Sequence, residues 1–391
     1  MDPRDLARSL ERRFDEYVEA LRELVDIDSG SYTPEGVNAV ADRCQRRFEA
    51  GGWQVERIPH RPGEGEPRLG DLLVGRLEGA GGARILLIGH MDTVFDPGTA
   101  AARPFTVEDG VARGPGVSDM KGGLLAGFFA VEALREVGFD GFGRITYVCN
   151  PDEEIGSPFS RATIAELART EADAAFVLES ARANGDIVSA RKGVTDFRIE
   201  VVGRAAHAGV EPEKGRSAIL EAAHKVVALQ GLNGRWPGVT VNVGVIRGGT
   251  RSNVVPDRCE LHVDVRSPAE ETLAAAEEEV RRLCGETVVP DVALRVEGHA
   301  WHRPMEKTEG TARLVEIARG VARELGFEVR DAATGGASDA NTTAAAGVPT
   351  LDGLGPVGGD DHSPAEWLDL SSVVPRTALL AGLIARTAQA S

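Results

Sequence analysis

The N-terminal fifty residues carry apolar side chains at intervals of three and four, the spacing of one helix face. The first stripe predicts a single helix across this segment, with members Leu6, Leu10, Phe14, Val18, Leu21 and Val25. Pro34 is expected to open a second helix, because proline suits the first helical turn. Glycines 51 and 52 are expected to end that helix, whose apolar face comprises Val37, Val40, Cys44 and Phe48.

Short apolar segments rich in branched residues follow, as is typical of strands buried on both faces of a sheet. They are DLLVGRL (71–77), RILLIG (84–89), RITYVC (144–149) and AAFVLE (174–179). A helical pattern, MKGGLLAGFFAVEALREVG (120–138), separates the second segment from the third. This alternation predicts an α/β layered fold with a mixed sheet flanked by helices.

The pattern changes near residue 195 to strand, helix, strand, strand, helix, strand. The segments span residues 195–203, 217–230, 239–246, 258–266, 269–284 and 291–298. This order matches the split βαβ, or ferredoxin-like, sandwich, which can bury one sheet face against its own helices. We therefore expect an α+β domain at 193–304, inserted into an α/β domain formed by 1–192 and 305–391.

The composition and charge of the chain limit its possible binding partners and its location in the cell. The chain has 391 residues, of which 61 are acidic and 44 basic, and its net charge of -17 repels phosphate backbones and anionic membranes. Neither nucleic acid nor a membrane is therefore expected as a partner. The charged N-terminal segment lacks the apolar core of a signal peptide, which predicts a cytoplasmic location. The cysteines lack a CxxC pair and are expected to be reduced and buried: Cys44, Cys149, Cys259 and Cys284.

Several predicted strands run into residues of the kinds that bind metals. RILLIG leads to His90, RITYVC to the acidic segment 150–154, and AAFVL to Glu179. Open α/β sheets place their sites beyond the carboxyl ends of the strands, so these side chains are expected to converge. In GHMDTV, a neutral His90 suits zinc, and Asp92 could accept the other ring N–H and fix its orientation. The alternative is a surface His–Asp pair.

Further carboxylates and a histidine extend the candidate site. In GPGVSDMKGG, glycines around Asp119 allow the close approach that a carboxylate bridging two metals needs, although a helix-capping aspartate is the simpler alternative. In NPDEEIGS, Glu153 and Glu154 suggest one metal ligand and one proton carrier, against the alternative of a solvated acidic loop. His362, in GGDDHSPAEW, is weak evidence by itself.

Together these motifs resemble the M20 family of zinc carboxypeptidases and deacylases over nearly the whole chain. The similarity is greatest to the glutamate carboxypeptidase-like branch, and the acetylornithine deacetylase and succinyl-diaminopimelate desuccinylase relatives are also similar. The motifs that carry it are GHMDTV, PFTVEDGVARGPGVSDMKGG, NPDEEIGS, GRAAHAG, TGGASDA and DHSPAEW, in that order. The resemblance implies a zinc-exopeptidase-like catalytic domain interrupted by a dimerisation domain.

The resemblance also implies the roles of the site residues. Asp119 would bridge two zinc ions, one completed by Glu154 and His362 and the other by His90 and Glu179. Cobalt or manganese could substitute for zinc in such a ligand set. Glu153 would be the general base, and a hydroxide shared by the metals would attack the amide carbonyl. Asp92 would orient His90, and a cis peptide bond is expected at Asp119–Met120.

Other matches to the family lie in or near the inserted domain. His207, in GRAAHAG, would reach the active site of a partner subunit and stabilise the oxyanion, which implies a homodimer formed through this domain. Asn253 and Arg303 match positions that hold the substrate carboxylate or oxyanion. A third substrate contact is expected at Gly336, in a loop that also contains Gly335, Ser338 and Asp339. The segment SARKG (189–193) departs from the glutamate-recognising branch, so Arg191 and Lys192 either attract an anionic substrate or are exposed charges.

The function implied is a di-zinc amide hydrolase that releases a C-terminal amino acid, possibly glutamate, from a peptide or an N-acyl amino acid. The alternative within the family is an N-acyl amino acid or diamino acid deacylase of the acetylornithine deacetylase or desuccinylase type. A silent ligand-binding protein should have lost ligands or the base, and all are present here. A scaffold role has no specific feature in its favour, because acidic charge commonly serves solubility.

Overall fold

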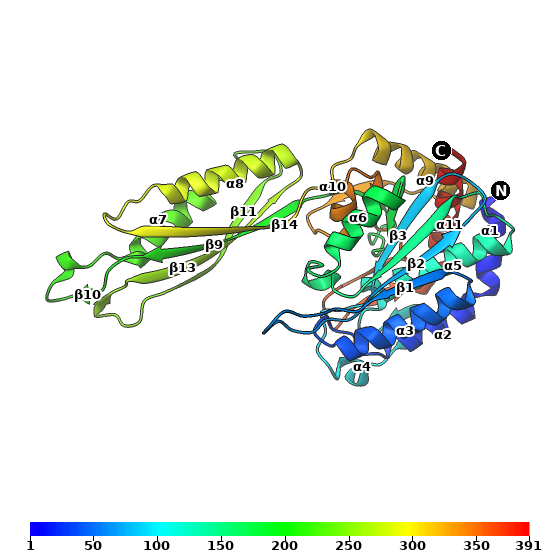
Figure 1. Cartoon of the computed structure of the whole chain (residues 1–391), viewed down its shortest axis with the longest axis horizontal. Coiled ribbons are helices and arrows are strands. Elements are labelled where there is room, and N and C mark those ends of the chain that lie inside the picture. Colours follow the sequence, from blue (N-terminus) through cyan, green and yellow to red (C-terminus); the bar gives the residue numbers. More distant parts are fainter. Residues whose placement is uncertain (391) are drawn as a thin grey trace. The chain divides into compact units, whose positions relative to one another are not determined.

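A computed structural model of the chain describes residues 1–390 and divides into two compact units. The first unit comprises Met1–Ser189, Lys307–Ala333 and the residues from Ser338 on. The second comprises Ala190–Glu306 and Thr334–Ala337. Figure 1 shows the elements of both units, with helices against the sheet in each. The α/β fold class with an inserted α+β unit is therefore confirmed.

The N-terminal segment forms two helices, so the prediction of one continuous helix was wrong. Helix α1 (Pro3–Arg12) and helix α2 (Phe14–Val25) meet at Arg13, whose φ of -109° and ψ of 10° are not helical. Within α2, Tyr17 is buried, and its hydroxyl donates to the carbonyl of Gly122 at 2.6 Å. Apolar spacing does not reveal such a break, because both helices keep the same interval. Helix α3 (Pro34–Ala50) begins at the predicted proline.

The first unit is built on a six-stranded sheet in the order β1-β2-β6-β3-β7-β16. Its four longest buried strands are the predicted ones, and β6, β3 and β7 run parallel to one another. Nearly every residue of these strands is buried, as expected for a sheet covered on both faces. The strands are β1 (Gln54–Ile58), β2 (Leu72–Glu78), β6 (Arg144–Asn150), β3 (Arg84–His90), β7 (Ala174–Val177) and β16 (Thr350–Leu351).

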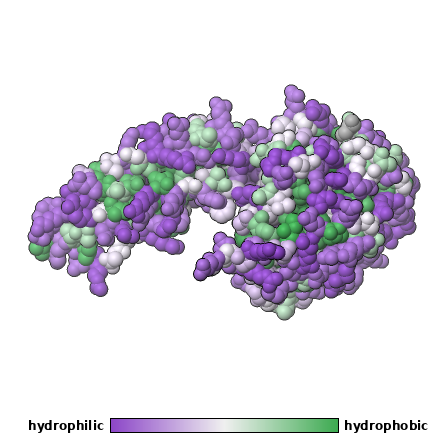
Figure 2. Space-filling model, viewed as in Figure 1, coloured by the Kyte–Doolittle hydropathy of each residue, from purple (hydrophilic) through white to green (hydrophobic). Residues whose placement is uncertain are grey.

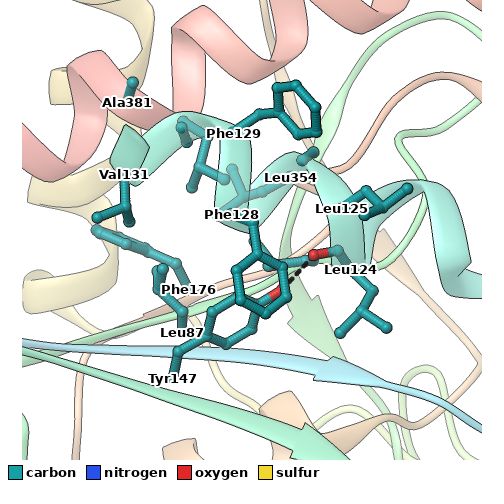
Figure 3. Packing of buried hydrophobic residues seen from close by; sticks show 14 of the residues in the cluster. Leu87, Leu124, Leu125, Phe128, Phe129, Val131, Tyr147, Phe176, Leu354 and Ala381 are labelled. Carbon is teal, nitrogen blue, oxygen red and sulfur yellow. Dashed lines mark hydrogen bonds between the residues drawn. The ribbon is translucent and has the colours of Figure 1, made fainter. Parts of the chain in front are cut away.

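Helix α5 (Gly122–Glu136) packs closely on this sheet. Figure 3 shows Tyr147, from β6, directed at the helix, where its hydroxyl donates to the carbonyl of Leu124 at 2.5 Å. The ring of Phe128 lies 4.9 Å from that of Tyr147. Gly127 permits this approach, because a Cβ there would lie 2.5 Å from the tyrosine oxygen. These contacts hold the first turns of α5 against the sheet and so position the turn that precedes the helix.

The other elements of the first unit surround this core. The helices are α4 (Thr99–Ala102), α6 (Arg161–Glu171), α9 (Glu309–Leu325), α10 (Asp339–Ala345) and α11 (Val373–Ala390). The short strands are β4 (Thr106–Glu108), β5 (Val111–Arg113), β8 (Ile187–Arg191, which runs into the second unit), β15 (Asp331–Thr334), β17 (Gly358–Gly359) and β18 (Trp367–Asp369). Strands β17, β18, β5 and β4 form a small sheet of their own.

The second unit has the predicted order of strand, helix, strand, strand, helix, strand. All neighbouring strands of its sheet, in the order β11-β13-β9-β14, are antiparallel. Burial alternates along β9 and β13, so one face packs on the two helices and the other is polar. The elements are β9 (Gly193–Val202), α7 (Ala218–Gln230), β11 (Thr240–Gly248), β13 (Arg258–Ser267), α8 (Glu270–Gly285) and β14 (Ala293–His302). A ribbon of β10 (Ala206–His207) and β12 (Val254–Val255) extends from it.

Two expectations about the whole chain can be compared with the structure. All four cysteines are buried and free, as predicted from their spacing. Between residues 1 and 390, no helix combines the length and the apolar character that crossing a bilayer demands.

Candidate metal centre

The first unit brings the six predicted metal-centre side chains together. His90 is the last residue of β3, the two adjacent glutamates lie in the turn after β6, and Glu179 follows β7 by two residues. Asp119 lies in the turn before α5, and His362 lies in the loop between β17 and β18. The convergence of strand ends follows from the parallel pairing of β6, β3 and β7.

Asp119 lies between two imidazoles. Its Oδ1 is 3.0 Å from Nε2 of His90, and its Oδ2 is 3.1 Å from Nε2 of His362. Each carboxylate oxygen therefore faces a different histidine, which is the arrangement that a bridging ligand requires. Helix α5 has no side-chain cap bond at its start, so the capping alternative for Asp119 is wrong. The Asp119–Met120 peptide bond is cis, as expected.

The remaining carboxylates complete two groups around this aspartate. His362 Nε2 is 3.1 Å from Glu154 Oε2, and His90 Nε2 is 3.7 Å from Glu179 Oε1. Ligand atoms of His90, Asp119 and Glu154 lie within 4.8 Å of one another, as do those of His90, Glu153 and Glu179. These oxygen and imidazole donors, without thiolate, suit zinc and also cobalt or manganese.

Glu154 provides a test of whether the site fits a cation. Its side chain is only 5% exposed, and its Oε1 is buried without a hydrogen-bond partner among the described residues. A buried carboxylate oxygen without a partner is costly unless something positive lies against it. The residues therefore fit a bound metal, and the alternative of a solvated acidic loop is wrong.

Burial and mutual charge shift the titration of these groups strongly. Burial raises the pKa of Glu154 to about 7, and burial together with the charge of Glu179 raises the pKa of Glu153 well above its usual range. The contacts with Asp119 and Glu154 raise the pKa of His362 to about 11. Burial opposes ionisation of Asp119, but its two histidine contacts hold its pKa far below the ordinary value. Such divergent shifts in one cluster are typical of functional sites.

Asp92 organises the strand ends around His90. The Nδ1 of His90 lies 3.0 Å from the Asp92 carbonyl and 3.4 Å from Asp92 Oδ1. A proton on Nδ1 donated to that carbonyl leaves Nε2 available as a metal ligand. The Asp92 carboxylate also accepts the backbone N–H groups of Glu153 and Glu154, each at 3.1 Å. His90 and Asp92 are almost fully buried, so the alternative of a surface pair is wrong.

Sequence reasoning missed several groups that hold the site in place. Ser31 donates its hydroxyl to Asp92 at 2.7 Å, and Glu366 accepts the backbone N–H groups of Gly116, Ser118 and Asp119 at 2.9, 2.9 and 3.0 Å. Glu366 lies within the DHSPAEW motif, so its position in that motif was a signal for a role at the site. Ser31 carried no such signal, because its contact with Asp92 spans 61 residues of sequence.

Ser338 and Asp339, predicted to lie in the loop of Gly336, fall in the first unit, are buried and have structural contacts. Asp339 accepts hydrogen bonds from Asn150 at 2.5 Å and from Ser157 at 2.7 Å. Ser338 caps α10 and donates to Asp352 at 2.7 Å. Asp339 therefore supports the turn that carries the paired glutamates, a connection that sequence reasoning did not make.

The other predicted residues lie in the second unit. His207 is exposed on β10, and its Nδ1 accepts the backbone N–H of Gly209 at 3.2 Å, which leaves Nε2 as a hydrogen-bond donor. Asn253 is close by, since its carbonyl accepts the N–H of Ala208 at 3.0 Å. Arg303 contacts Glu270 and Glu277, each at 3.3 Å.

The loop of the second unit that contains Gly335 and Gly336 is held by arginines. The Gly336 carbonyl accepts from Arg191 at 3.1 Å, and the Gly335 carbonyl accepts from Arg266 at 2.9 Å. The backbone of Lys192 donates to the carbonyl of Thr334 at 3.1 Å. Of the two basic residues of SARKG, Arg191 thus holds this loop through its side chain, whereas Lys192 contacts it through its backbone N–H.

Comparison with known proteins places the chain in a family. Residues 86–386 match the peptidase family M20/M25/M40. The chain is 32% identical over 373 residues to carboxypeptidase G2 of Pseudomonas sp. (strain RS-16), covering 94% of this chain and 88% of that protein. It is 30% identical over 258 residues to acetylornithine deacetylase of Myxococcus xanthus, covering 63% of this chain and 65% of that protein.

Solved structures agree with the sequence matches. Aminopeptidase PepT from Bacillus cereus superimposes with a TM-score of 0.79 at 27% identity, covering 96% of this chain and 99% of that one. The resemblance to the M20 family is therefore confirmed. The chain belongs to peptidase family M20/M25/M40 and is a metal-dependent hydrolase of the peptidase and deacylase type.

Proposed function

We propose that the protein holds two zinc ions and hydrolyses an amide bond next to a free carboxylate, releasing a C-terminal amino acid from a peptide or an N-acyl amino acid. The observation that carries this proposal is the placement of Asp119, with one oxygen toward His90 and the other toward His362. Glu179 lies on the His90 side of this aspartate and Glu154 on the His362 side, and both would be further ligands. Bound zinc would polarise the substrate carbonyl and lower the pKa of water.

The residues around the metals would handle the proton. Glu153 lies with Glu179 and His90, and burial raises the pKa of its carboxyl well above the usual range. A raised pKa makes the Glu153 carboxylate a stronger base, which suits taking a proton from water and passing it to the leaving nitrogen. Asp92, fixed by Ser31 and by two backbone N–H groups, would keep His90 oriented while this happens.

The second unit would supply the remaining catalytic contacts. We propose that His207 donates from Nε2 to the oxyanion in the active site of a partner subunit, as its exposed position and protonation pattern support. Asn253, Arg303 and the Gly336 loop are the proposed contacts for the substrate carboxylate. Arg303 would have to exchange its carboxylate partners, Glu270 and Glu277, for the substrate.

An apolar surface of the second unit supports dimerisation there. Leu220 and Val227 of α7 are 52% and 75% exposed and lie two turns apart on one helix face, and Ile246 is exposed on β11. Figure 2 shows hydrophobic residues gathered over the region where Figure 1 places α7. Among residues 1–390, β11 pairs only with β13, so its outer edge can accept another strand. We propose that two copies associate through this helix and strand edge.

The experiment that tests the function is a substrate panel on the zinc-loaded chain. Dipeptides, N-acyl amino acids, N-acetylornithine and N-succinyl-diaminopimelate would be assayed, with zinc, cobalt and manganese reloaded in turn. We expect turnover of dipeptides or N-acyl α-amino acids, and loss of turnover with retained metal in Glu153→Gln. Turnover of N-acetylornithine or N-succinyl-diaminopimelate alone would instead support the deacylase function that the Myxococcus xanthus relative suggests.

Sedimentation analysis tests the dimer. We expect the wild-type chain to sediment as a dimer and Val227→Glu to sediment as a monomer, because a charge would be buried at the interface. Val107→Glu is the matched control, since Val107 is an exposed valine of the first unit. A wild-type monomer at micromolar concentration, or a Val227→Glu dimer, would contradict the proposed interface.

A further inference from the structure

A hollow of about 280 Å³ lies beside the metal centre within the first unit. Its walls come from two segments, residues 30–33 and 93–97, together with Glu154 and Ile155. Tyr32 and Val94 line it and are 63% and 42% exposed, although both are large hydrophobic side chains. Two exposed apolar side chains facing one concavity beside a candidate ligand point to a binding function for that concavity.

The backbone of the two wall segments is tied together. Thr93 N–H donates to the Ser29 carbonyl at 2.9 Å, and Ser31 N–H donates to the Thr93 carbonyl at 3.2 Å. Gly30 lies so close to the other segment that a Cβ there would be 2.4 Å from the carbonyl oxygen of Phe95. The pocket is therefore preformed, because its walls cannot separate without breaking these contacts.

The same backbone also positions the metal centre. Ser31, between Gly30 and Tyr32 in the wall, donates its hydroxyl to Asp92 at 2.7 Å. Asp92 in turn accepts the backbone N–H of Glu154, which itself lines the pocket. The distance between pocket and metal ligands is thus fixed by short hydrogen-bonded connections, as a substrate subsite requires.

The lining favours an apolar occupant of about the size of a ring. Tyr32, Phe95, Val94 and Ile155 supply aromatic and aliphatic surface, and no lysine or arginine lines the hollow among residues 1–390. Apart from the proposed metal ligand Glu154, the charged side chain that lines it is Asp96, which is acidic and would repel an anionic group. A cavity of about 150 Å³ accommodates benzene in a protein interior, so this volume admits a substituted ring.

The position of Glu153 indicates which part of the substrate the hollow faces. Under the proposed function, Glu153 returns a proton to the leaving nitrogen, so the nitrogen lies on the side of Glu153 and Glu179. The hollow borders Glu154 instead. We propose that this pocket binds the acyl substituent of the scissile amide and selects a ring-sized apolar acyl group, an inference that rests on the proposed amide hydrolysis.

The first test compares acyl groups on one amino acid. The zinc-loaded wild-type chain would be assayed with the N-acetyl, N-benzoyl and N-succinyl derivatives of the amino acid that it releases fastest from dipeptides. Burying a ring predicts a kcat/KM for the benzoyl compound about tenfold or more above the acetyl compound, with the succinyl compound the poorest. Equal values for acetyl and benzoyl, or a preference for succinyl, would overturn the inference.

The second test asks whether Tyr32 forms the pocket. In Tyr32→Ala we expect kcat/KM for the benzoyl substrate to fall about tenfold more than that for the acetyl substrate, whereas Tyr32→Phe keeps the wild-type ratio. Val107→Ala, an exposed apolar substitution elsewhere in the first unit, should change neither value. An equal fall for both substrates in Tyr32→Ala would assign Tyr32 a general structural role and reject the specificity pocket.

A binding measurement separates this inference from the proposed reaction. N-benzoylglycine would be titrated by calorimetry into zinc-loaded Glu153→Gln, with and without Tyr32→Ala, and N-acetylglycine would serve as the reference. We expect N-benzoylglycine to bind about tenfold more tightly than N-acetylglycine, and the advantage to disappear with Tyr32→Ala. If no amide is hydrolysed but this advantage is seen, the proposed function fails and the pocket stands. If hydrolysis occurs without the advantage, the pocket is rejected.

Discussion

The two units of the molecule treat buried charge in opposite ways. In the second unit the buried carboxylate, Glu221, lies 3.0 Å from the ammonium of Lys225 and accepts the N–H groups of Val288 and Val289. At the metal centre of the first unit, four carboxylates lie among two histidines. Glu154 Oε1 and Glu221 Oε1 are both buried without a hydrogen bond, but only Glu221 Oε1 has a lysine ammonium against it. The contrast teaches that an acidic cluster indicates a cation site when the protein leaves its charge unbalanced, and a structural element when the protein neutralises it.

The strands of the two units also differ in which of their side chains are buried. Along β3 of the first unit, successive residues such as Leu86 and Leu87 are both buried, because helices cover both faces. Along β9 of the second unit, Ile199 is buried while its neighbour Arg198 is exposed and pairs with Glu260. Charged side chains on the outer face of this sheet therefore stay in water, where they need no bound ion.

The largest expected effect is that of removing the bridging carboxylate. Asp119→Asn should lose bound zinc and several kcal/mol of transition-state stabilisation, roughly 10³-fold or more in rate. Glu221→Gln is the matched control, since its carboxylate is buried but neutralised by Lys225, and zinc content and kcat should be retained. Metal analysis and steady-state kinetics of both variants measure these effects. Retention of both zinc and rate in Asp119→Asn would end the distinction between the two acidic sites.

We expect the second unit to contribute to catalysis through His207. His207→Ala should lower kcat about 10²- to 10³-fold without loss of zinc, because an oxyanion donor is removed. If the histidine acts in the partner's site, mixing and re-equilibrating His207→Ala with Glu153→Gln chains should restore about a quarter of wild-type activity, since half of random dimers are mixed and each holds one complete site. No recovery in exchanged dimers would place His207 in its own subunit's site or outside catalysis.

Core substitutions should reveal the different burial of the two sheets. Leu86→Ala and Leu87→Ala are each expected to cost about 2 to 4 kcal/mol of unfolding free energy in the first unit. Ile199→Ala should cost a similar amount in the second unit, whereas Arg198→Ala, next to it, should cost about 1 kcal/mol or less. Urea unfolding followed by circular dichroism measures these values. A tolerated substitution at Leu86 or Leu87 would show that one face of β3 is not packed.

Much of this organisation was predictable from the sequence. Strands ending at His90 and Asn150 were visible because buried parallel strands are continuous apolar runs, and the order of elements in the second unit followed from its change to alternation. The break at Arg13 was not visible, because it leaves the apolar interval unchanged.

The contacts that hold the site were less accessible to sequence reasoning. The hydrogen bond from Ser31 to Asp92 and that from Asn150 to Asp339 join residues 61 and 189 positions apart. The residue type alone does not predict either contact, since serine and asparagine are common in loops. The metal ligands were identifiable because their types are chemically restricted, whereas residues that orient ligands can be of almost any polar type.

The smallest predicted effect uses a buried thiol of the second unit as a probe of that unit alone. Burial raises the pKa of Cys284, on α8, from 9.0 to about 11. Because the folded state keeps the thiol protonated while the unfolded state ionises, the contribution to stability is complete below pH 9 and is lost as the pH rises toward 11. The free energy of unfolding of the wild type should therefore fall by about 1 kcal/mol between pH 8 and pH 10 relative to that of Cys284→Ala.

Val280→Ala, an apolar substitution one turn away, is the control for this prediction. Its free energy of unfolding should differ from that of the wild type by the same amount at both pH values in urea titrations. If Cys284→Ala and Val280→Ala behaved alike, the thiol would be accessible to water, and the second unit would be less closely packed than its alternating strands indicate.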